Sequence, residues 1–346
     1  MTLTNHSIIT LDGSNGEGGG QILRTALGLS ALTGKPFSIE KIRANRSKPG
    51  LMRQHLTAVN AVTEICQAKT EGAAIGSASL TFIPGPVRAG DYHFSVGSAG
   101  STTLVFQAIL PALLTAAGPS TITLEGGTHN PFSPPLDFLS DAFVPVVNRM
   151  GPTVAIEQER YGFNPAGGGR WRATISPAPR LTPINLTERG EAGERSATAL
   201  VASLPGEIAK RELARVGRRL GWDGDALRVR QLPGDQGPGN VLLLKIQSEN
   251  VTEVFTGFGQ KGTSAEAVAD AAIDGARAYL LSSAPVGDHL ADQLVVPFAI
   301  AGGGEFVATR STPHLKTNVE MIERFLDVRI SLAESDAGVR CTVRPR

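Results

Sequence analysis

Apolar residues near the N-terminus switch between the two-residue period of a strand and the wider period of an amphipathic helix. Positions 8–11 form a short apolar run, and a helical pattern follows over 21–33. The pattern then predicts a strand at 37–42, a helix opened by Pro49 and Gly50, and strands near 79–83 and 92–96. We therefore expect a β-α-β-α-β-β unit here.

The same order of elements recurs twice along the chain. The second copy is predicted to have a small-residue loop at 97–101, helices at 104–114 and 136–150, and strands near 121–124, 153–158 and 170–175. The third begins at 181–186 and resumes with helices near 292–301 and 317–325 and strands near 305–309, 328–332 and 339–343. The interval from Pro134 to Pro313 is roughly twice that from Pro49 to Pro134, so extra residues interrupt the third copy.

The extra residues have predicted elements of their own, with helices at 207–220 and 264–281 and strands near 197–203, 227–231, 241–247 and 253–256. We predict a mixed α/β (α+β) fold in which three β-α-β-α-β-β units form a large pseudo-threefold domain. This domain covers 1–186 and 286–346, and a smaller α/β domain is inserted at 187–285. Such repeats favour a site between units.

Composition narrows the class of protein. The chain has 346 residues, is 41% hydrophobic and carries a net charge of +1, so a polyanion would need a local basic patch. Two cysteines make no disulfide framework, which fits a reducing compartment. The N-terminus has no signal-peptide pattern and no apolar run is long enough to cross a bilayer, so we expect a cytoplasmic protein without a membrane partner.

The segment 11–24 joins the first strand to the first helix, and in it four glycines surround one carboxylate, Glu17. It lacks the Gly-Lys-Ser/Thr ending of a Walker loop, and Gln21 stands where a dinucleotide fingerprint needs a third glycine. The segment is either a tight turn that packs a helix against a sheet or part of an anion site. A lone acid at a helix start favours the second interpretation.

His314 has the most informative neighbourhood of the six histidines, because small polar residues surround it before the helix predicted at 317–325. We expect it to lie in the loop that precedes this helix. A neutral imidazole is a competent nucleophile toward phosphorus, and an ordinary histidine of a capping region is the alternative.

A basic segment, 43–53, holds four cations. Arginine forks bind phosphate oxygens, so the segment suits a terminal phosphate or a nucleic-acid backbone, and a solvated loop is the alternative. No aromatic residue interleaves with these cations, so base stacking is not predicted for this segment.

Elsewhere, 287–293 offers either hydrogen bonds to a nucleoside or a helix cap at Asp288, and 233–240 is predicted to be a turn. No Cys/His cluster has zinc spacing.

Taken together, these motifs resemble the RNA 3′-terminal phosphate cyclases. The resemblance runs in register over essentially the whole chain and rests on 12–24, 43–55, 97–101, 235–240 and 314–318. It implies the threefold fold with an insert, and a ligase that uses ATP to convert an RNA 3′-phosphate into a 2′,3′-cyclic phosphodiester. In such enzymes a histidine is adenylylated, AMP passes to the RNA 3′-phosphate, and the 2′-hydroxyl then expels AMP.

The resemblance also implies residue roles. His314 matches the nucleophile, and Glu17 matches the acid that supports a divalent cation, Mg²⁺ or Mn²⁺, at the nucleotide. Positions that match phosphate and RNA ligands are Arg24, Arg43, Arg46 and Gln54, and those that match the ATP-binding surface are Gln107, Pro134, His289, Leu290, Ala291, Asp292 and Gln293. Asp292 is expected to be the polar anchor of that surface. Some members carry tyrosine where this chain has His289, which leaves ring stacking there open.

Two other functions remain as alternatives. A non-catalytic relative in ribosome assembly shares the fold but lacks the nucleophilic histidine, so His314 argues against a scaffold. Enolpyruvyl transferases use similar repeated units but are longer and lack a histidine nucleophile. The physiological RNA, the oligomeric state and the role of the insert are not predicted.

Overall fold

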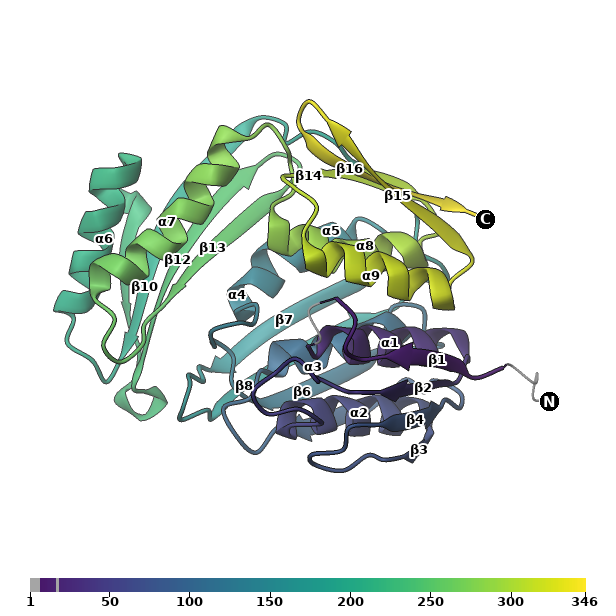
Figure 1. The fold of residues 1–346 in the computed structure, drawn as a ribbon. Coiled ribbons are helices and arrows are strands. Elements are labelled where there is room, and N and C mark those ends of the chain that lie inside the picture. The colour runs from purple at the N-terminus through teal and green to yellow at the C-terminus, as the bar shows by residue number, and fades with distance from the viewer. Residues whose placement is uncertain (1–6, 17–18) are drawn as a thin grey trace.

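Three of the four β-sheets in the described part of the chain share one strand order and one pattern of pairing (Figure 1). The computed structural model describes residues 7–16 and 19–346. In each of these sheets the first two strands pair in parallel, and the fourth strand pairs antiparallel with both the second and the third. Parallel strands need a crossover connection, and each of these connections contains at least one helix. The mixed α/β class is confirmed.

The first sheet has the order β1-β2-β4-β3. Its elements are β1 (Ile9–Asp12), α1 (Gln21–Thr33), β2 (Phe37–Glu40), α2 (Arg53–Cys66), β3 (Lys69–Glu71) and β4 (Leu80–Ile83). Helix α1 has the bounds predicted for it, and Gly34 ends it in the left-handed conformation, as a C-terminal glycine should. The prediction omitted β3, whose three residues are all exposed and carry no apolar signal.

The strand predicted at 92–96 was assigned to the wrong unit. It corresponds to β5 (Asp91–Ser95), which pairs in parallel with β6 (Ser120–Gly126) and begins the second sheet, β5-β6-β8-β7. The remaining elements are α3 (Thr102–Leu113), α4 (Leu136–Phe138), the π-helical turn η1 (Leu139–Phe143), α5 (Val144–Asn148), β7 (Thr153–Arg160) and β8 (Gly169–Ser176). The helix predicted at 136–150 is therefore a continuous run of α4, η1 and α5 that ends at Asn148. Pro145, which has no backbone N–H, lies in the first turn of α5, directly after the π turn.

The third sheet, β15-β16-β14-β9, is assembled from residues on both sides of a long interruption. It contains β9 (Asn185–Leu186), α8 (Asp288–Ile300), β14 (Gly304–Ala308), α9 (Pro313–Phe325), β15 (Val328–Ser335) and β16 (Gly338–Pro345). Helix α8 begins before the predicted start at 292. Its N-cap is Gly287, so Asp288 is not the cap and instead accepts hydrogen bonds from Thr309 and Arg310.

The interrupting residues form the fourth sheet, β11-β10-β12-β13, which α6 and α7 accompany (Figure 1). Its elements are β10 (Ala192–Ala202), α6 (Glu207–Leu220), η2 (Gly224–Ala226), β11 (Leu227–Gln231), η3 (Gly234–Gln236), β12 (Gly239–Ser248), β13 (Thr252–Phe258) and α7 (Ala265–Leu281). The segment predicted as a turn at 233–240 contains η3. Many buried side chains of this sheet and of α6 and α7 form a separate hydrophobic cluster, which includes Trp222. Trp171 belongs to the larger cluster, which covers the other three sheets. These features favour the proposed insertion, and its boundaries stay a prediction.

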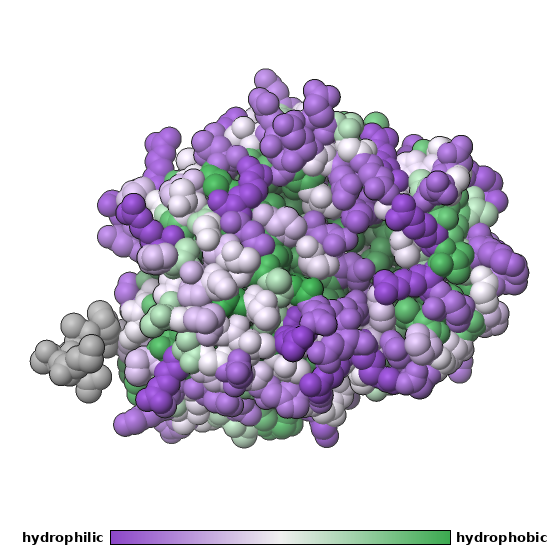
Figure 2. All heavy atoms as spheres, turned by 180° about the vertical axis from the view of Figure 1, so that it is seen from behind, coloured by the Kyte–Doolittle hydropathy of each residue, from purple (hydrophilic) through white to green (hydrophobic). Residues whose placement is uncertain are grey.

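Helices α1, α3, α8 and α9 pack on one another and bring the three sheets together. The view from behind shows a largely polar surface with separate apolar patches (Figure 2). No helix in the described part of the chain is long and apolar enough to cross a membrane. Because α1 and α9 are in contact, the start of the first unit lies beside the end of the third.

Arg189 ties the two ends of the interruption together. Its guanidinium donates to the carbonyls of Tyr279 and Ala284 at 2.6 and 2.8 Å and lies 3.7 Å from the centre of the Tyr279 ring. Next to it, the buried Glu253 carboxylate accepts from the Gly287 N–H, at the start of α8. Burial raises the pKa of Glu253 to about 8. The hydrogen bond from the Gly287 N–H and the charge of Arg189 lower this pKa by a smaller amount.

Candidate active site

His314 lies in the first turn of α9, not in a loop before the helix as predicted. Thr312 is the N-cap, and its hydroxyl accepts a hydrogen bond from the Leu315 N–H at 2.9 Å. Pro313 occupies the first helical position, where a missing N–H costs nothing. The Thr-Pro pair therefore starts the helix before the apolar periodicity becomes visible, and this fixes the backbone that carries His314.

A buried polar network holds the start of α9. The Asp292 carboxylate, on α8, accepts a hydrogen bond from the capping hydroxyl of Thr312, and the Asp292 carbonyl accepts one from the Asn318 amide at 2.7 Å. The other side of Asn318 accepts from the Thr25 hydroxyl on α1 at 2.8 Å. Asp292, predicted as a nucleotide anchor, is thus also a support for the helix that carries His314.

Gln21 makes two hydrogen bonds to His314, which is 293 residues away in sequence. Its amide nitrogen donates to the His314 carbonyl at 3.0 Å, and its amide oxygen contacts Nδ1 of the imidazole. The first bond determines how the amide is turned, since a carbonyl can only accept. Oε1 of Gln21 must then accept from Nδ1–H, so in the neutral ring the lone pair lies on Nε2.

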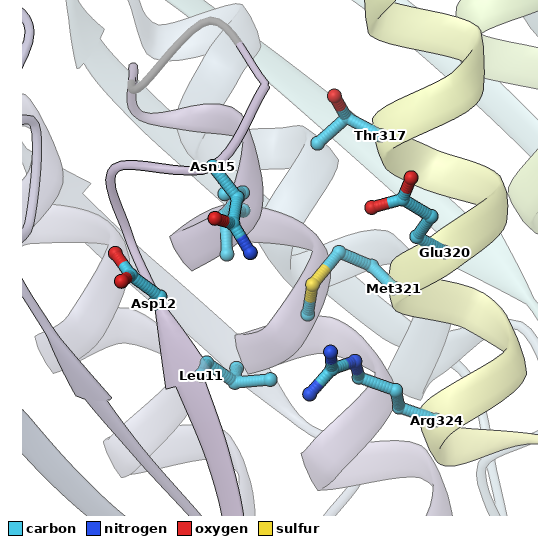
Figure 3. Close-up of a pocket in the computed structure, with 8 residues that line it drawn as sticks. Leu11, Asp12, Asn15, Thr317, Glu320, Met321 and Arg324 are labelled. Atoms are coloured by element: carbon cyan, nitrogen blue, oxygen red, sulfur yellow. The ribbon is translucent and has the colours of Figure 1, made fainter.

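The glycine segment, residues 11–24, approaches α9 closely, and Figure 3 shows Asn15 across from Thr317 and Glu320. Gly16 has a φ of +57°, and a Cβ there would lie 2.3 Å from the Thr317 hydroxyl. Only glycine fits this position, which supports the packing interpretation of the loop without excluding the anion site. The predicted metal residue, Glu17, lies outside the described residues.

Arg24 and His55 line the start of α1. A Cβ on Gly20 would lie 2.5 Å from Nε2 of His55 and 2.7 Å from the Arg24 guanidinium. Burial lowers the pKa of Arg24 to about 10, and burial together with Arg24 and Arg43 lowers the pKa of His55 to about 3. Nε of Arg24 is buried and has no hydrogen-bond partner among the described residues. A partly buried cation with a buried, unused donor is suited to an anion such as a phosphate.

His55 lies within the motif at 43–55, and its sequence neighbourhood predicts no role for it. The Met52 N–H donates to its Nδ1 at 3.3 Å, so the neutral ring carries its proton on Nε2, next to Gly20 and Arg24. A histidine in an apolar helical face carries no signal in the sequence that separates this position from ordinary core.

The predicted phosphate ligands of the basic segment differ in their surroundings. One guanidinium nitrogen of Arg43 donates to the carbonyls of Lys48 and Gly50 at 2.6 and 2.9 Å, so this nitrogen stabilises the loop that carries Arg43. Arg46 reaches the glycine segment, where its guanidinium lies 2.9 Å from a Cβ placed on Gly19. Gln54 accepts a hydrogen bond from the Ser101 N–H at 2.9 Å, at the start of α3.

The predicted ATP surface is only partly brought together. Gln107 and Gln293 are hydrogen bonded to each other, and the Pro134 carbonyl accepts from Thr103, on the same helix as Gln107. His289 is exposed. Leu290 and Ala291 have no exposed surface, so their side chains belong to the core, and their contact with a nucleotide stays a prediction. The described residues contain no group of three or more His, Cys, Asp or Glu that could hold a metal ion.

The fold and the site define a mixed α/β protein in which α9 presents a histidine to a glycine loop that Arg24 and Arg46 adjoin. The profile of the RNA 3′-terminal phosphate cyclase family matches residues 15–332. A protein named RNA 3′-terminal phosphate cyclase from Koribacter versatilis is 50% identical over 98% of this chain and 96% of its own. Proteins of the same name from Ralstonia nicotianae and Salmonella enteritidis are 54% and 50% identical, each over 96% of this chain and 95% and 97% of their own. This chain belongs to the RNA 3′-terminal phosphate cyclase family.

Proposed function

We propose that this chain converts an RNA 3′-terminal phosphate into a 2′,3′-cyclic phosphodiester at the expense of ATP, with His314 as a covalent nucleophile. Family membership supports the overall reaction. The observation that carries the mechanism is the pair of hydrogen bonds between Gln21 and His314, which directs the lone pair to Nε2. We further propose that the reaction takes place in the cytoplasm.

The proposed sequence has three displacements at phosphorus. Nε2 of His314 attacks the α-phosphorus of ATP, a nitrogen–phosphorus bond forms, and the bond to the bridging oxygen breaks as pyrophosphate leaves. An oxygen of the RNA 3′-phosphate then takes AMP and restores the imidazole. Finally the 2′-hydroxyl loses its proton and attacks the activated phosphorus, and AMP leaves. A covalent intermediate divides one difficult condensation into easier steps.

The arginines beside the glycine segment have a clear role in this proposal. Negative charge builds up on the α-phosphate and on pyrophosphate in the first step, and preorganised donors stabilise it without reorganising. Arg24 offers a buried, unused Nε–H for this purpose, and Arg46 lies beside the glycine segment. We propose Gln107, Pro134, His289, Asp292 and Gln293 for the ATP surface, and Arg43 and Gln54 for the RNA end.

A divalent cation is proposed to accompany the triphosphate. Mg²⁺ is commonly held by one or two carboxylates together with substrate phosphates and needs no all-protein cage, so the lack of a ligand cluster among the described residues is compatible with it. Bound there, the ion would neutralise charge on the triphosphate. Glu17 is the proposed carboxylate.

Incubation with ATP labelled at the α-phosphate and Mg²⁺ tests the nucleophile. We expect covalent labelling of the wild type, no labelling of His314→Ala, and normal labelling of His93→Ala, a histidine on β5 outside the site. Undiminished label in His314→Ala would remove the proposed nucleophile. A wild type that takes no label would favour the non-catalytic scaffold.

A further inference from the structure

A groove of about 590 Å³ opens between the second unit and the interrupting residues. Its size lies within the usual range of small-molecule sites. Three stretches of the second unit line it, α2 contributes Gln54, and the loop after β13 contributes Gln260. The lining residues are Gln54, Ser98, Ala99, Gly100, Ser101, Leu104, Asn130, Pro131, Phe132, Ser133, Asn164, Pro165 and Gln260.

None of the lining residues carries a charge, although the groove is rich in polar groups. Its amides and hydroxyls can donate and accept hydrogen bonds, as the edges of a nucleobase and a ribose require. The groove offers no cationic side chain to neutralise the charge of a phosphate. The lining therefore suits a nucleoside and not its phosphate.

Phe132 is the most unusual of the lining residues. Its side chain is 100% exposed, and its backbone has a φ of +64°, which non-glycine residues seldom adopt. No part of the described chain covers this ring. An exposed aromatic ring at the edge of a polar groove is a stacking surface for a base, which single-stranded nucleic-acid sites use repeatedly.

Gln54 connects the groove to the basic segment 43–53, because it is the second residue of α2 and follows that segment directly. Its Oε1 accepts from the Ser101 N–H, so its amide N–H groups are directed elsewhere. Arg53 donates to the Gly97 carbonyl at 3.2 Å, in the loop that leads into the groove. A neutral groove thus adjoins a cationic loop, which matches a nucleoside followed by a phosphate.

We propose that this groove binds a terminal nucleoside of the RNA substrate and that its base stacks on Phe132. The inference rests on the proposed function for the identity of the RNA. The adenosine of ATP is the other possible nucleoside. RNA is favoured because the proposed ATP contacts Gln107 and Gln293 meet elsewhere and neither lines the groove.

Binding of a 3′-phosphorylated hexauridylate, measured by fluorescence anisotropy without ATP, tests the proposal. Loss of one base–aromatic stack costs about 1–3 kcal/mol, so Phe132→Ala should raise the Kd roughly 5- to 150-fold. Phe132→Tyr, which keeps the ring, should stay within about twofold on the same grounds. Leu281→Ala is the matched control, because Leu281 is an apolar side chain of α7 that is 85% exposed and does not line the groove. It should bind like the wild type.

A second oligonucleotide without its terminal bases identifies the partner of Phe132. Phe132→Ala should bind this abasic RNA almost as the wild type does, since the stack is already absent. Equal loss for both oligonucleotides, or no loss for either, overturns the proposal. Weaker binding of ATP with unchanged binding of RNA also overturns it and assigns the groove to ATP. Because these measurements need no turnover, a failure of the labelling experiment and a failure of the groove are distinguishable.

Discussion

Replacing Gln21 by methionine tests whether this residue prepares His314 for attack. Methionine keeps the length of the side chain but removes both hydrogen bonds to His314, those to its carbonyl and to Nδ1. A hydrogen bond of this kind is worth about 1 kcal/mol net, so the loss is about 2 kcal/mol. If both bonds hold the ring in its reactive position, labelling by ATP should slow ~30-fold.

The assay is the single-turnover rate of labelling at saturating ATP, together with the urea midpoint followed by tryptophan fluorescence. Thr25→Val is the matched control, because it lies one turn further along α1 and removes one hydrogen bond to α9, at Asn318, without touching the imidazole. It should lower the free energy of unfolding by about 1 kcal/mol and leave the labelling rate within about threefold.

A third variant, Gln21→Glu, separates the tautomer from simple packing. A carboxylate can still accept from Nδ1–H, but its charge favours the protonated imidazole, so the optimum for labelling should move to higher pH. The reasoning fails if Gln21→Met labels at the wild-type rate, or if Thr25→Val slows labelling as much as Gln21→Met does.

Three further changes test the supports of the site. Glu253 has a pKa of about 8 in the folded state, above its ordinary value of 4.5, so between these pH values the folded state holds a proton that the unfolded state has lost. The free energy of unfolding therefore falls as pH rises across this window. In Glu253→Gln the slope of the free energy of unfolding in urea against pH should flatten there. Thr312→Val removes the hydroxyl that caps α9 and should cost about 1–2 kcal/mol in urea unfolding, with Thr312→Ser close to wild type; equal losses would exclude the cap as the cause. Gly16→Ala adds a Cβ 2.3 Å from the Thr317 hydroxyl at a φ of +57°, so its urea midpoint should drop further than that of Gly34→Ala, which has a φ of +73° but no atom within 4 Å.

Local patterns predicted most helices and strands of this protein. The helices α1 and α6 have their predicted bounds because an apolar face, stop signals and glycine C-caps all lie within the helices or next to them. The repeated order of elements was visible for the same reason. The motifs that resemble the RNA 3′-terminal phosphate cyclases were also local, and they identified the family before any geometry was known.

Long-range pairing decided what the local patterns could not. The short polar strand β3 exists because β4 pairs with it, and β5 belongs to the second sheet because its partner, β6, follows a whole helix later. The start of α9 at Pro313 depends on a cap that Asp292, from another helix, holds in place. A local window contains none of these partners.

The site itself is a product of tertiary structure. The sequence singled out His314 but could not show that Gln21, 293 residues away, contacts both its carbonyl and its ring. It also found no aromatic residue in the basic segment, whereas the fold places Phe132 in the same groove as Gln54. Residue types and short spacings reveal which chemistry a chain can perform. Which side chains meet depends on the packing of α1, α3, α8 and α9, and that packing is set by contacts between residues far apart in the chain.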